Sequence, residues 1–514
     1  MRTRTTFKIT IYFILLLAVL LIIYYPSFKN APRSDYWVVM YHFHLVDNSP
    51  EPPGWLSICN YDPWEHGTFR PAAHLLLYLE HTFFGTSFVW NHLINFFMYY
   101  LSIILLYLLA VRLSLDKYLT AIFLVVYAFL FSHFDIITWT FQIFTTMSFV
   151  SFLAGFLLYI KFLSSGRKLL LPLIGLLFVF GMICFELYAF WPLAIIILTL
   201  GRRFFLKDDR KPDSRKLLGT GLIFLAVIYS VYLTIFIITR SAANTSGDLP
   251  ELNLELIILG ICSVFFNLLY NGLLINLLPF LTEPLVIRDN LDMAGILVGW
   301  YKSLAEIIYL TGGSAILLVG TGAVLLYRKK KRKTLFILSF FAFLLFTYFF
   351  IVAVSRLTTN DIWYPFTQFR YQYIANALLF LMVITILSRL LRPARLGKIV
   401  ISCILLPILL VNLLLSHKYM TLINSQLKPL SVMLADIQFR IDQGDINSQS
   451  RLYIEDGVTA HLPPLCWNED MARFMPGNYR WFFPEKDQDC FSSSLSEAAW
   501  VIRGDDYLKI KGSL

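Results

Sequence analysis

Charged side chains are scarce in this sequence. Of its 514 residues, 15% are charged and 58% are hydrophobic, and the mean hydropathy is +0.66. A water-soluble chain of this size needs far more polar surface, so the composition excludes a soluble globular protein and indicates a polytopic membrane protein. The formal net charge of +10 does not indicate a nucleic-acid partner, because the basic residues fall in short loops between apolar runs.

Nucleotide-binding and common metal motifs are also missing. The sequence contains no GxxxxGK[ST], GxGxxG, CxxC or HExxH pattern, so nothing in it indicates ATP or dinucleotide binding. Among six cysteines, Cys184, Cys262 and Cys403 lie in apolar runs and are expected to pack as small hydrophobes. Cys466 and Cys490 share the polar C-terminal segment, where an oxidising compartment would allow a disulfide between them.

The apolar runs predict eleven membrane spans, because a span needs about 20 apolar residues. The first run follows Arg2, Arg4 and Lys8 and has no small-residue cleavage site, so we expect a retained helix rather than a cleaved signal peptide. Basic turns between runs place the N-terminus in the cytoplasm and the C-terminus outside. The runs are about 9–25, 91–111, 117–134, 140–160, 169–184, 186–200, 217–239, 311–327, 334–354, 371–388 and 399–415.

The spans divide the chain into a transmembrane module, residues 1–415, and an extracytoplasmic C-terminal domain, residues 416–514. The C-terminal segment is polar and has short strand-like stretches, which predict a small α+β domain. The first outer loop, residues 26–90, is expected to include an amphipathic helix on the membrane surface. Residues 255–281 fit either a re-entrant hairpin or an in-plane helix pair, since a single crossing would break the alternation of loops.

Residues 34–71, within the first outer loop, gather ionisable side chains beside the bilayer, which predicts an active site. Asp35 follows the first span and is partly desolvated there, so it suits a general base, although an ordinary juxtamembrane charge fits its position equally. Asp62 and Glu65 suit a base, an acceptor contact or metal ligands, with solvated loop charges as the alternative. We expect no cofactor. A further hint of a divalent cation is a loosely spaced set, His42, His44 and Asp47.

Polar residues also end several other spans on the same side. Arg70 lies where the loop returns to the membrane and suits a phosphate, or a lipid headgroup. Glu186 interrupts an apolar stretch, and an ionisable group at that depth is usually functional or paired. Carboxylates with arginines fit the displacement of a phosphate from a sugar, and aromatic faces fit sugar binding. The remaining candidates at these ends are His92, His133, Asp135, Arg356, Arg370 and Tyr371.

With these residues the chain resembles integral-membrane glycosyltransferases of the GT-C type. It is most similar to TMTC-like and PMT-like protein O-mannosyltransferases and to bacterial relatives that use polyprenyl-phosphate sugars. The resemblance covers roughly residues 30–380 and rests on an ordered set of short motifs. They are Asp35, Phe69-Arg70-Pro71, Phe84-Gly85, Asn91-His92-Leu93-Ile94-Asn95, His133-x-Asp135 with Trp139, Phe185-Glu186 with Pro192, and Arg370-Tyr371-x-Tyr373.

The resemblance implies a polyprenyl-phosphate sugar donor and inversion at the sugar carbon. Arg70, Arg370 and Arg356 would bind the donor phosphate, and Asp35 would deprotonate the acceptor hydroxyl. Tyr36 stands where the family has a second acid, so Asp35 acts alone or Asp62 or Glu65 supplies the partner. The tetratricopeptide tail of eukaryotic relatives is absent, which favours a bacterial inner membrane. The acceptor is a protein, a lipid or a polysaccharide.

Two other classes stay open. A transporter or flippase for lipid-linked glycans would show inverted repeats and charges within several helices, and the sequence shows no matching halves. A glycan ligase or polymerase usually carries its large outer loop late in the chain, whereas here the loop follows the first span.

Overall fold

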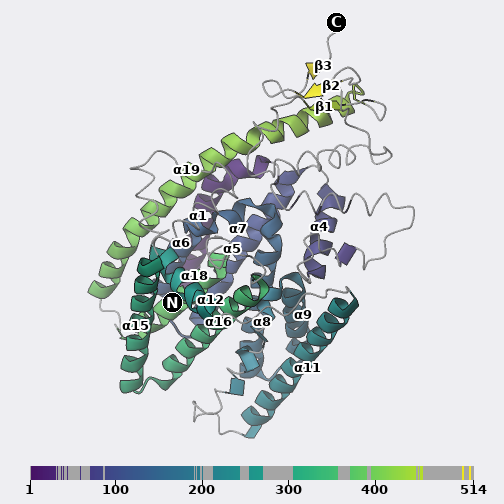
Figure 1. The fold of residues 1–514 in the computed structure, drawn as a ribbon. Coiled ribbons are helices and arrows are strands. Elements are labelled where there is room, and N and C mark those ends of the chain that lie inside the picture. Colours follow the sequence, from purple (N-terminus) through teal and green to yellow (C-terminus); the bar gives the residue numbers. More distant parts are fainter. Residues whose placement is uncertain are drawn as a thin grey trace.

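A computed structural model describes most of the apolar part of the chain. The described residues are 2–30, 70–84, 87–189, 212–242, 254–269, 305–356, 371–390, 395–446, 452–454, 500–502 and 509–510, with isolated positions between them. They form a bundle of helices, and a small sheet lies at the far end of the longest one (Figure 1).

Eight helices in the described residues are long and apolar enough to cross a membrane, or up to nine if one bent pair is a single span. This confirms a polytopic helical membrane protein. The predicted run 169–184 forms a shorter helix, α9 (Leu171–Cys184), and the run 186–200 lies partly outside the described residues, so the count of eleven stays a prediction. The eight are α1 (Arg2–Tyr24), α5 (Phe88–Arg112), α8 (Ile143–Ser165), α11 (Pro212–Ala242), α15 (Ala305–Arg328), α16 (Arg332–Arg356), α18 (Gln372–Leu390) and α19 (Arg395–Asp442).

The bent pair replaces the single run predicted over 117–134. Helix α6 (Lys117–Ala128) meets η2 (Phe131–His133) and α7 (Phe134–Thr138) at an angle of 63°. Two side chains satisfy backbone groups that the break leaves open. The Tyr99 hydroxyl donates to the Ala128 carbonyl at 2.9 Å, and the Asn412 side chain accepts from the Phe131 N–H at 2.8 Å. A break at membrane depth is tolerated when neighbouring helices supply such partners.

The two ends of the bundle differ in chemistry. At the basic end, Asp116 caps α6 by accepting from the Tyr118 and Leu119 N–H groups at 3.0 Å and pairs with Lys398 at 3.2 Å. At the opposite end, which we call the polar end, α1 leads into η1 (Tyr25–Lys29), α4 (Pro71–Phe84) packs on α5 and α9, and α5 begins.

Short turns complete the polar end. Helices α7 and α8 are joined through η3 (Thr140–Gln142), and η5 (Glu186–Tyr188) follows α9, which itself begins after η4 (Lys168–Leu170) at the basic end. Helices α8 and α9 pack closely because Gly155 has no side chain. A Cβ atom there would lie 2.7 Å from the Phe178 ring.

Helix α12 (Leu254–Leu269) covers the first half of the segment predicted as re-entrant or in-plane. It packs against α15, α16 and α18, and Gly312 of α15 meets the backbone of Cys262 so closely that a Cβ atom would overlap it. Residues 270–281 lie outside the described residues, so the choice between the two predicted forms stays open.

Helix α19 is 48 residues long, yet its apolar part spans only Gly397–Lys418. Its remaining half carries the sheet, in which β1 (Leu452–Ile454) runs parallel to β2 (Trp500–Ile502) and β3 (Lys509–Ile510) runs antiparallel to β2. The Arg440 guanidinium lies 4.8 Å from the Trp500 ring and joins the helix to the sheet. Strands β1 and β2 fall in the stretches 451–455 and 499–503 that the sequence predicts as strand-like, whereas β3 was not predicted.

Candidate functional site

Three buried polar side chains at the start of α5 anchor the polar end. Asn91, His92 and Asn95 are at most 1% exposed. On a helix, positions 91 and 95 share one face, whereas position 92 is turned by about 100°. These residues belong to the motif that the sequence analysis singled out. Each contacts a different segment of the chain, so this turn of α5 is the point at which those segments meet.

Asn91 joins α4 and the segment after α1 to α5. Its amide nitrogen donates to Glu80 Oε2 at 2.7 Å and lies 3.4 Å from the Tyr36 hydroxyl. Tyr36 is fully buried and follows Asp35 directly in the sequence. The contact therefore fixes the chain one residue after the predicted base.

His92 holds the end of η1. Its Nε2 lies 3.1 Å from the Asn30 carbonyl oxygen, and its ring stacks on Phe28 with centroids 6.4 Å apart. The Asn30 amide nitrogen in turn donates to Asn424 Oδ1 of α19 at 2.6 Å. The exit of the first span is thus fixed from two sides.

Asn95 holds the turn between α7 and α8. Its amide nitrogen donates to the Ile136 carbonyl at 2.7 Å and to the Ile137 carbonyl at 3.3 Å, while its Oδ1 accepts from the Thr146 hydroxyl at 3.0 Å. Carbonyls at a helix C-terminus lack intrahelical partners, so Asn95 serves as their cap. Asp135, half-buried on α7, is placed by this contact.

An ion pair joins Arg70 to Glu186. Arg70 Nε donates to Glu186 Oε2 at 2.6 Å, and Nη2 donates to Oε1. The two side chains are only 10% and 16% exposed. The guanidinium also lies 5.0 Å from the Phe144 ring and 4.7 Å from the Phe185 ring. A cation between aromatic rings and a bidentate carboxylate is held in one orientation.

The aromatic rings beside Arg70 continue as a row. Trp139 and Phe141 have centroids 5.9 Å apart, Phe141 and Phe144 5.2 Å, and Phe144 and Phe185 4.9 Å. The row runs from the α7–α8 turn to η5. It gives the cation an apolar surround, in which charge interactions are stronger than in water.

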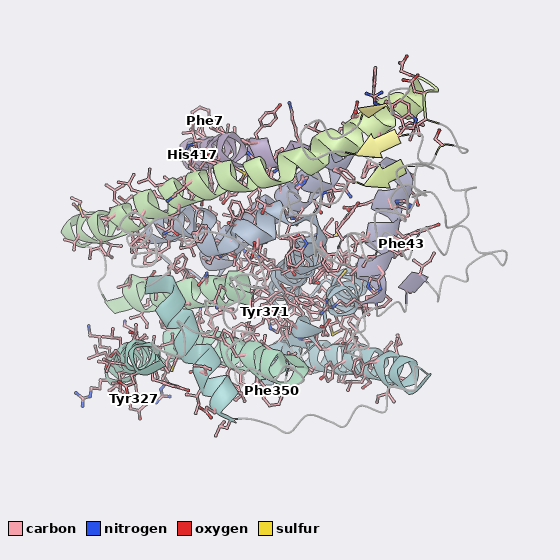
Figure 2. The ribbon with its side chains drawn as sticks, turned by 45° about the horizontal axis from the view of Figure 1, so that its top comes forward. Phe7, Phe43, Tyr327, Phe350, Tyr371 and His417 are labelled. Carbon is pink, nitrogen blue, oxygen red and sulfur yellow. The ribbon has the colours of Figure 1, made fainter. Side chains whose placement is uncertain are left out.

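His133 and Tyr371 lie among the helices of the bundle. His133 is fully buried, with Nδ1 3.0 Å from the Tyr99 hydroxyl, Nε2 3.4 Å from the Asn376 amide nitrogen and the Tyr127 ring 4.5 Å away. Tyr371 is 3% exposed and lies in the interior, unlike Tyr327 at the edge (Figure 2). His133 and Tyr371 are therefore packed interior residues, and their predicted roles in the site stay predictions.

Several predicted site residues lie outside the described residues. They are Asp35, Asp62, Glu65 and Arg370, with the side chain of Arg356, the suggested metal set His42, His44 and Asp47, and the suggested disulfide Cys466–Cys490. The part of the chain that is described contains no group of three metal-ligating side chains.

Glu80 is the polar-end residue that the sequence analysis did not single out. It is 6% exposed, and burial raises its pKa to about 8. The signal was the spacing of Ala73, Leu77 and Glu80, which are all buried on one face of α4. A carboxyl at the third position of an apolar stripe points into the protein rather than to solvent.

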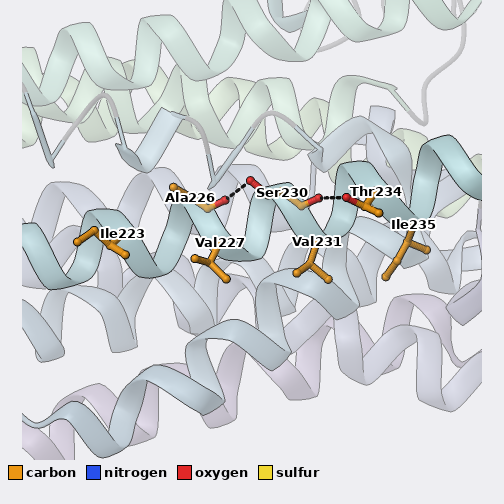
Figure 3. Close-up of a pocket in the computed structure, with 7 residues that line it drawn as sticks. All are labelled: Ile223, Ala226, Val227, Ser230, Val231, Thr234 and Ile235. Carbon is orange, nitrogen blue, oxygen red and sulfur yellow. Dashed lines mark hydrogen bonds between the residues drawn. The ribbon is translucent and has the colours of Figure 1, made fainter.

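A groove of about 500 Å³ runs along one face of α11 (Figure 3). Ser230 and Thr234 turn their hydroxyls back to the Ala226 and Ser230 carbonyls, each at 2.9 Å. The face is therefore apolar despite these two residues. Ile223 and Val227 on it are 68% and 55% exposed, as expected for a surface that contacts lipid tails.

No protein-family model matches the chain, and a search of curated proteins finds no match. The resemblance to glycosyltransferases therefore rests on the short sequence motifs alone and stays a prediction.

Proposed function

We propose that the protein is a membrane glycosyltransferase that moves a sugar from a polyprenyl-phosphate donor to an acceptor hydroxyl with inversion. The observation that supports this best is the polar turn of α5. Through Asn91, His92 and Asn95 it gathers the segment after Asp35, the helix after Arg70 and the helix of Asp135 at one end of the bundle. These are the segments on which the chemistry was predicted.

In the proposed reaction, the acceptor oxygen attacks the anomeric carbon from the face opposite the phosphate. The new C–O bond forms as the bond to the phosphate oxygen breaks, and Asp35 takes the hydroxyl proton, with Asp62 or Glu65 as a partner acid. The leaving phosphate departs as an anion, so nearby cations replace a general acid. Arg70, Arg370 and Arg356 supply that positive charge.

The ion pair to Glu186 supports a role for Arg70 as a fixed cation. A guanidinium already oriented before the donor binds needs little reorganisation as charge develops on the phosphate. The adjacent aromatic row, including Trp139 and Phe141, is buried and keeps water away from this cation. The apolar face of α11 is the kind of surface that a polyprenyl chain requires.

The proposal also includes the finer topology. We infer eleven spans, an N-terminus in the cytoplasm, and a polar end and C-terminal α+β domain that face outward from a bacterial inner membrane. The gathering of basic residues at the other end supports this orientation, because cytoplasmic loops carry an excess of Lys and Arg. They include Arg112, Lys117, Lys161, Arg328, Arg332 and Lys398.

The test is transfer of radiolabelled sugar from a panel of polyprenyl-phosphate sugars in membranes that contain wild type, Asp35→Asn or a matched control, Glu306→Gln. Glu306 is an exposed acid on α15. We expect one donor to be used, and Asp35→Asn to lower the rate by about 100-fold or more, as loss of a general base does. The control should transfer at the wild-type rate.

Two other outcomes are informative. Transfer that survives in Asp35→Asn would assign the base to Asp62 or Glu65. If wild type consumes no donor even with native acceptor membranes present, the glycosyltransferase proposal is wrong and a transporter of lipid-linked glycans becomes the better reading.

A further inference from the structure

Glu80 is a buried carboxyl that the proposed reaction does not use. Its Oε2 accepts one hydrogen bond, from Asn91 at 2.7 Å. Among the residues that the structure describes, Oε1 of Glu80 and Oδ1 of Asn91 have no hydrogen-bond partner. An ionised carboxylate in the interior needs several donors or a cation. The surroundings of Glu80 therefore suit the neutral acid.

The groups that face Glu80 agree with a neutral state. From the segment after α1 comes the hydroxyl of Tyr36, whose pKa burial raises well above its usual value, with Glu80 as a further cause. Helix α5 presents the uncharged Asn91, and α9 has no charged residue in its sequence. The other titratable residues of α4 are His74, Tyr78 and His81, and the Arg70–Glu186 pair lies at the other end of that helix. Burial raises the pKa of Glu80 to about 8, against the smaller lowering effect of the hydrogen bond from Asn91.

The chain of contacts leads from Glu80 to the predicted base. Asn91 donates to Glu80 and lies 3.4 Å from the Tyr36 hydroxyl, and Tyr36 is fully buried. Tyr36 is the residue directly after Asp35 in the sequence, so these contacts hold the chain next to the predicted base.

We propose that Glu80, in its neutral form, is a positioning residue that holds the segment of Asp35 through Asn91 and Tyr36. This inference rests on the proposed function, since it assigns the task of placing the general base. Loss of the proton would strengthen the bond from Asn91 but would leave a buried charge with that one donor among the described residues. Hydration of this charge would separate the packed segments around Glu80 and Tyr36. Transfer should therefore fall as the pH rises through the range in which Glu80 ionises.

The test compares wild type, Glu80→Gln, Glu80→Ala and Tyr36→Phe in the transfer assay from about pH 6 to about pH 10. Glutamine has the shape of the neutral acid and cannot ionise. We expect Glu80→Gln to match wild type within about twofold near neutral pH and to lose the alkaline fall, because its side chain keeps the Asn91 contact. Glu80→Ala and Tyr36→Phe should lower kcat by about tenfold or more, as misplacement of a reacting group does.

Either of two results would overturn the inference. An alkaline fall in Glu80→Gln that equals the wild-type fall would assign it to another group. A Glu80→Gln variant as weak as Glu80→Ala near neutral pH would show that the ionisable carboxyl itself is required. The Asp35→Asn variant tests the proposed function separately from the role of Glu80. Full activity in that variant would exclude Asp35 as the base, whereas the melting measurement on Glu80 described next would be unaffected.

A second measurement does not depend on the reaction. In the folded protein the pKa of Glu80 is about 8, whereas in the unfolded chain this pKa has its ordinary value of 4.5. The folded state therefore binds more protons in this window, and its stability falls as the pH rises from 4.5 to 8. The melting temperature of the purified protein should drop over this range in wild type and drop less in Glu80→Gln. Equal slopes in the two proteins would contradict a neutral Glu80.

Discussion

At the scale of single residues, the Arg70–Glu186 pair both holds the structure together and belongs to the proposed chemistry. Removal of one member of a buried pair leaves the other charge uncompensated, whereas replacement of both by apolar residues is often tolerated. The side chains are 10% and 16% exposed, so this pair falls close to the buried case. The pair therefore offers a way to separate stability from function.

We expect Glu186→Leu to destabilise the protein because Arg70 loses its bidentate carboxylate partner, and breaking a buried pair costs about 3–5 kcal/mol. The double variant Arg70→Leu with Glu186→Leu should regain most of the wild-type melting temperature but should not transfer sugar. Thermal unfolding in detergent and the transfer assay measure the two effects. A double variant that transfers at the wild-type rate would exclude Arg70 from donor binding.

The sequence identified the members of this pair but not the pairing. Arg70 and Glu186 each attracted attention as a charge at a span end, yet they are 116 positions apart, and nothing local connects them. The same holds for Asn91 with Glu80 and His92 with Asn30. A single sequence reveals which polar residues lie near the bilayer, while their partners depend on how the helices pack.

At the scale of elements, small residues set how closely helices approach. In a membrane, helix association relies on packing, so a glycine at a crossing permits contact that a larger side chain prevents. Gly312 lies at the α12–α15 crossing against Cys262, while a Cβ atom on the neighbouring Gly313 would meet nothing within 4 Å. The two glycines form a matched pair.

Gly312→Leu should push α12 away from α15 and destabilise the protein by roughly 1–3 kcal/mol, as overpacking does. Gly313→Leu should behave as wild type. The melting temperature and the folded yield after detergent extraction provide the comparison. Equal losses in both variants would mean that this crossing does not control stability.

Hydrophobic runs predicted the long helices well and their interruptions poorly. The runs near α5, α8 and α16 coincide with observed helices, since length and apolarity determine a span. The run 117–134 is continuous in hydropathy but bends by 63°. Its break depends on Tyr99 and Asn412, which lie on other helices, and the hydropathy of a run carries no information about such partners.

At the scale of the whole molecule, α19 connects the C-terminal sheet to the first span. By helix geometry its 48 residues extend about 70 Å. Asn424, beyond the apolar part of the helix, accepts from Asn30 at 2.6 Å, and Arg440 lies against Trp500. The composition predicted a membrane module and a polar C-terminal segment, but not that one helix serves both.

Asn424→Leu should therefore affect the far end of the chain in sequence. Of the two residues that bond to Asn30, His92 and Asn424, the variant keeps only His92. We expect the transfer rate to fall by about tenfold. The loss of one hydrogen bond, about 1 kcal/mol, should lower the melting temperature by only a few degrees. Val432→Ala, an exposed position on the same helix, is the control. An unchanged rate in Asn424→Leu would show that α19 does not influence the site.

Hydrogen bonds between residues far apart in the sequence also constrain how the protein can be made. The partners are separated by 271 residues for Ser102 and Tyr373, 281 for Phe131 and Asn412, and 394 for Asn30 and Asn424. Helices emerge from the ribosome in order, so the early ones enter the bilayer with polar groups whose partners have not yet been synthesised. The first half of the chain thus passes through a period in which it depends on water, lipid headgroups or chaperones for those bonds, and assembly is completed only when the final helix is inserted.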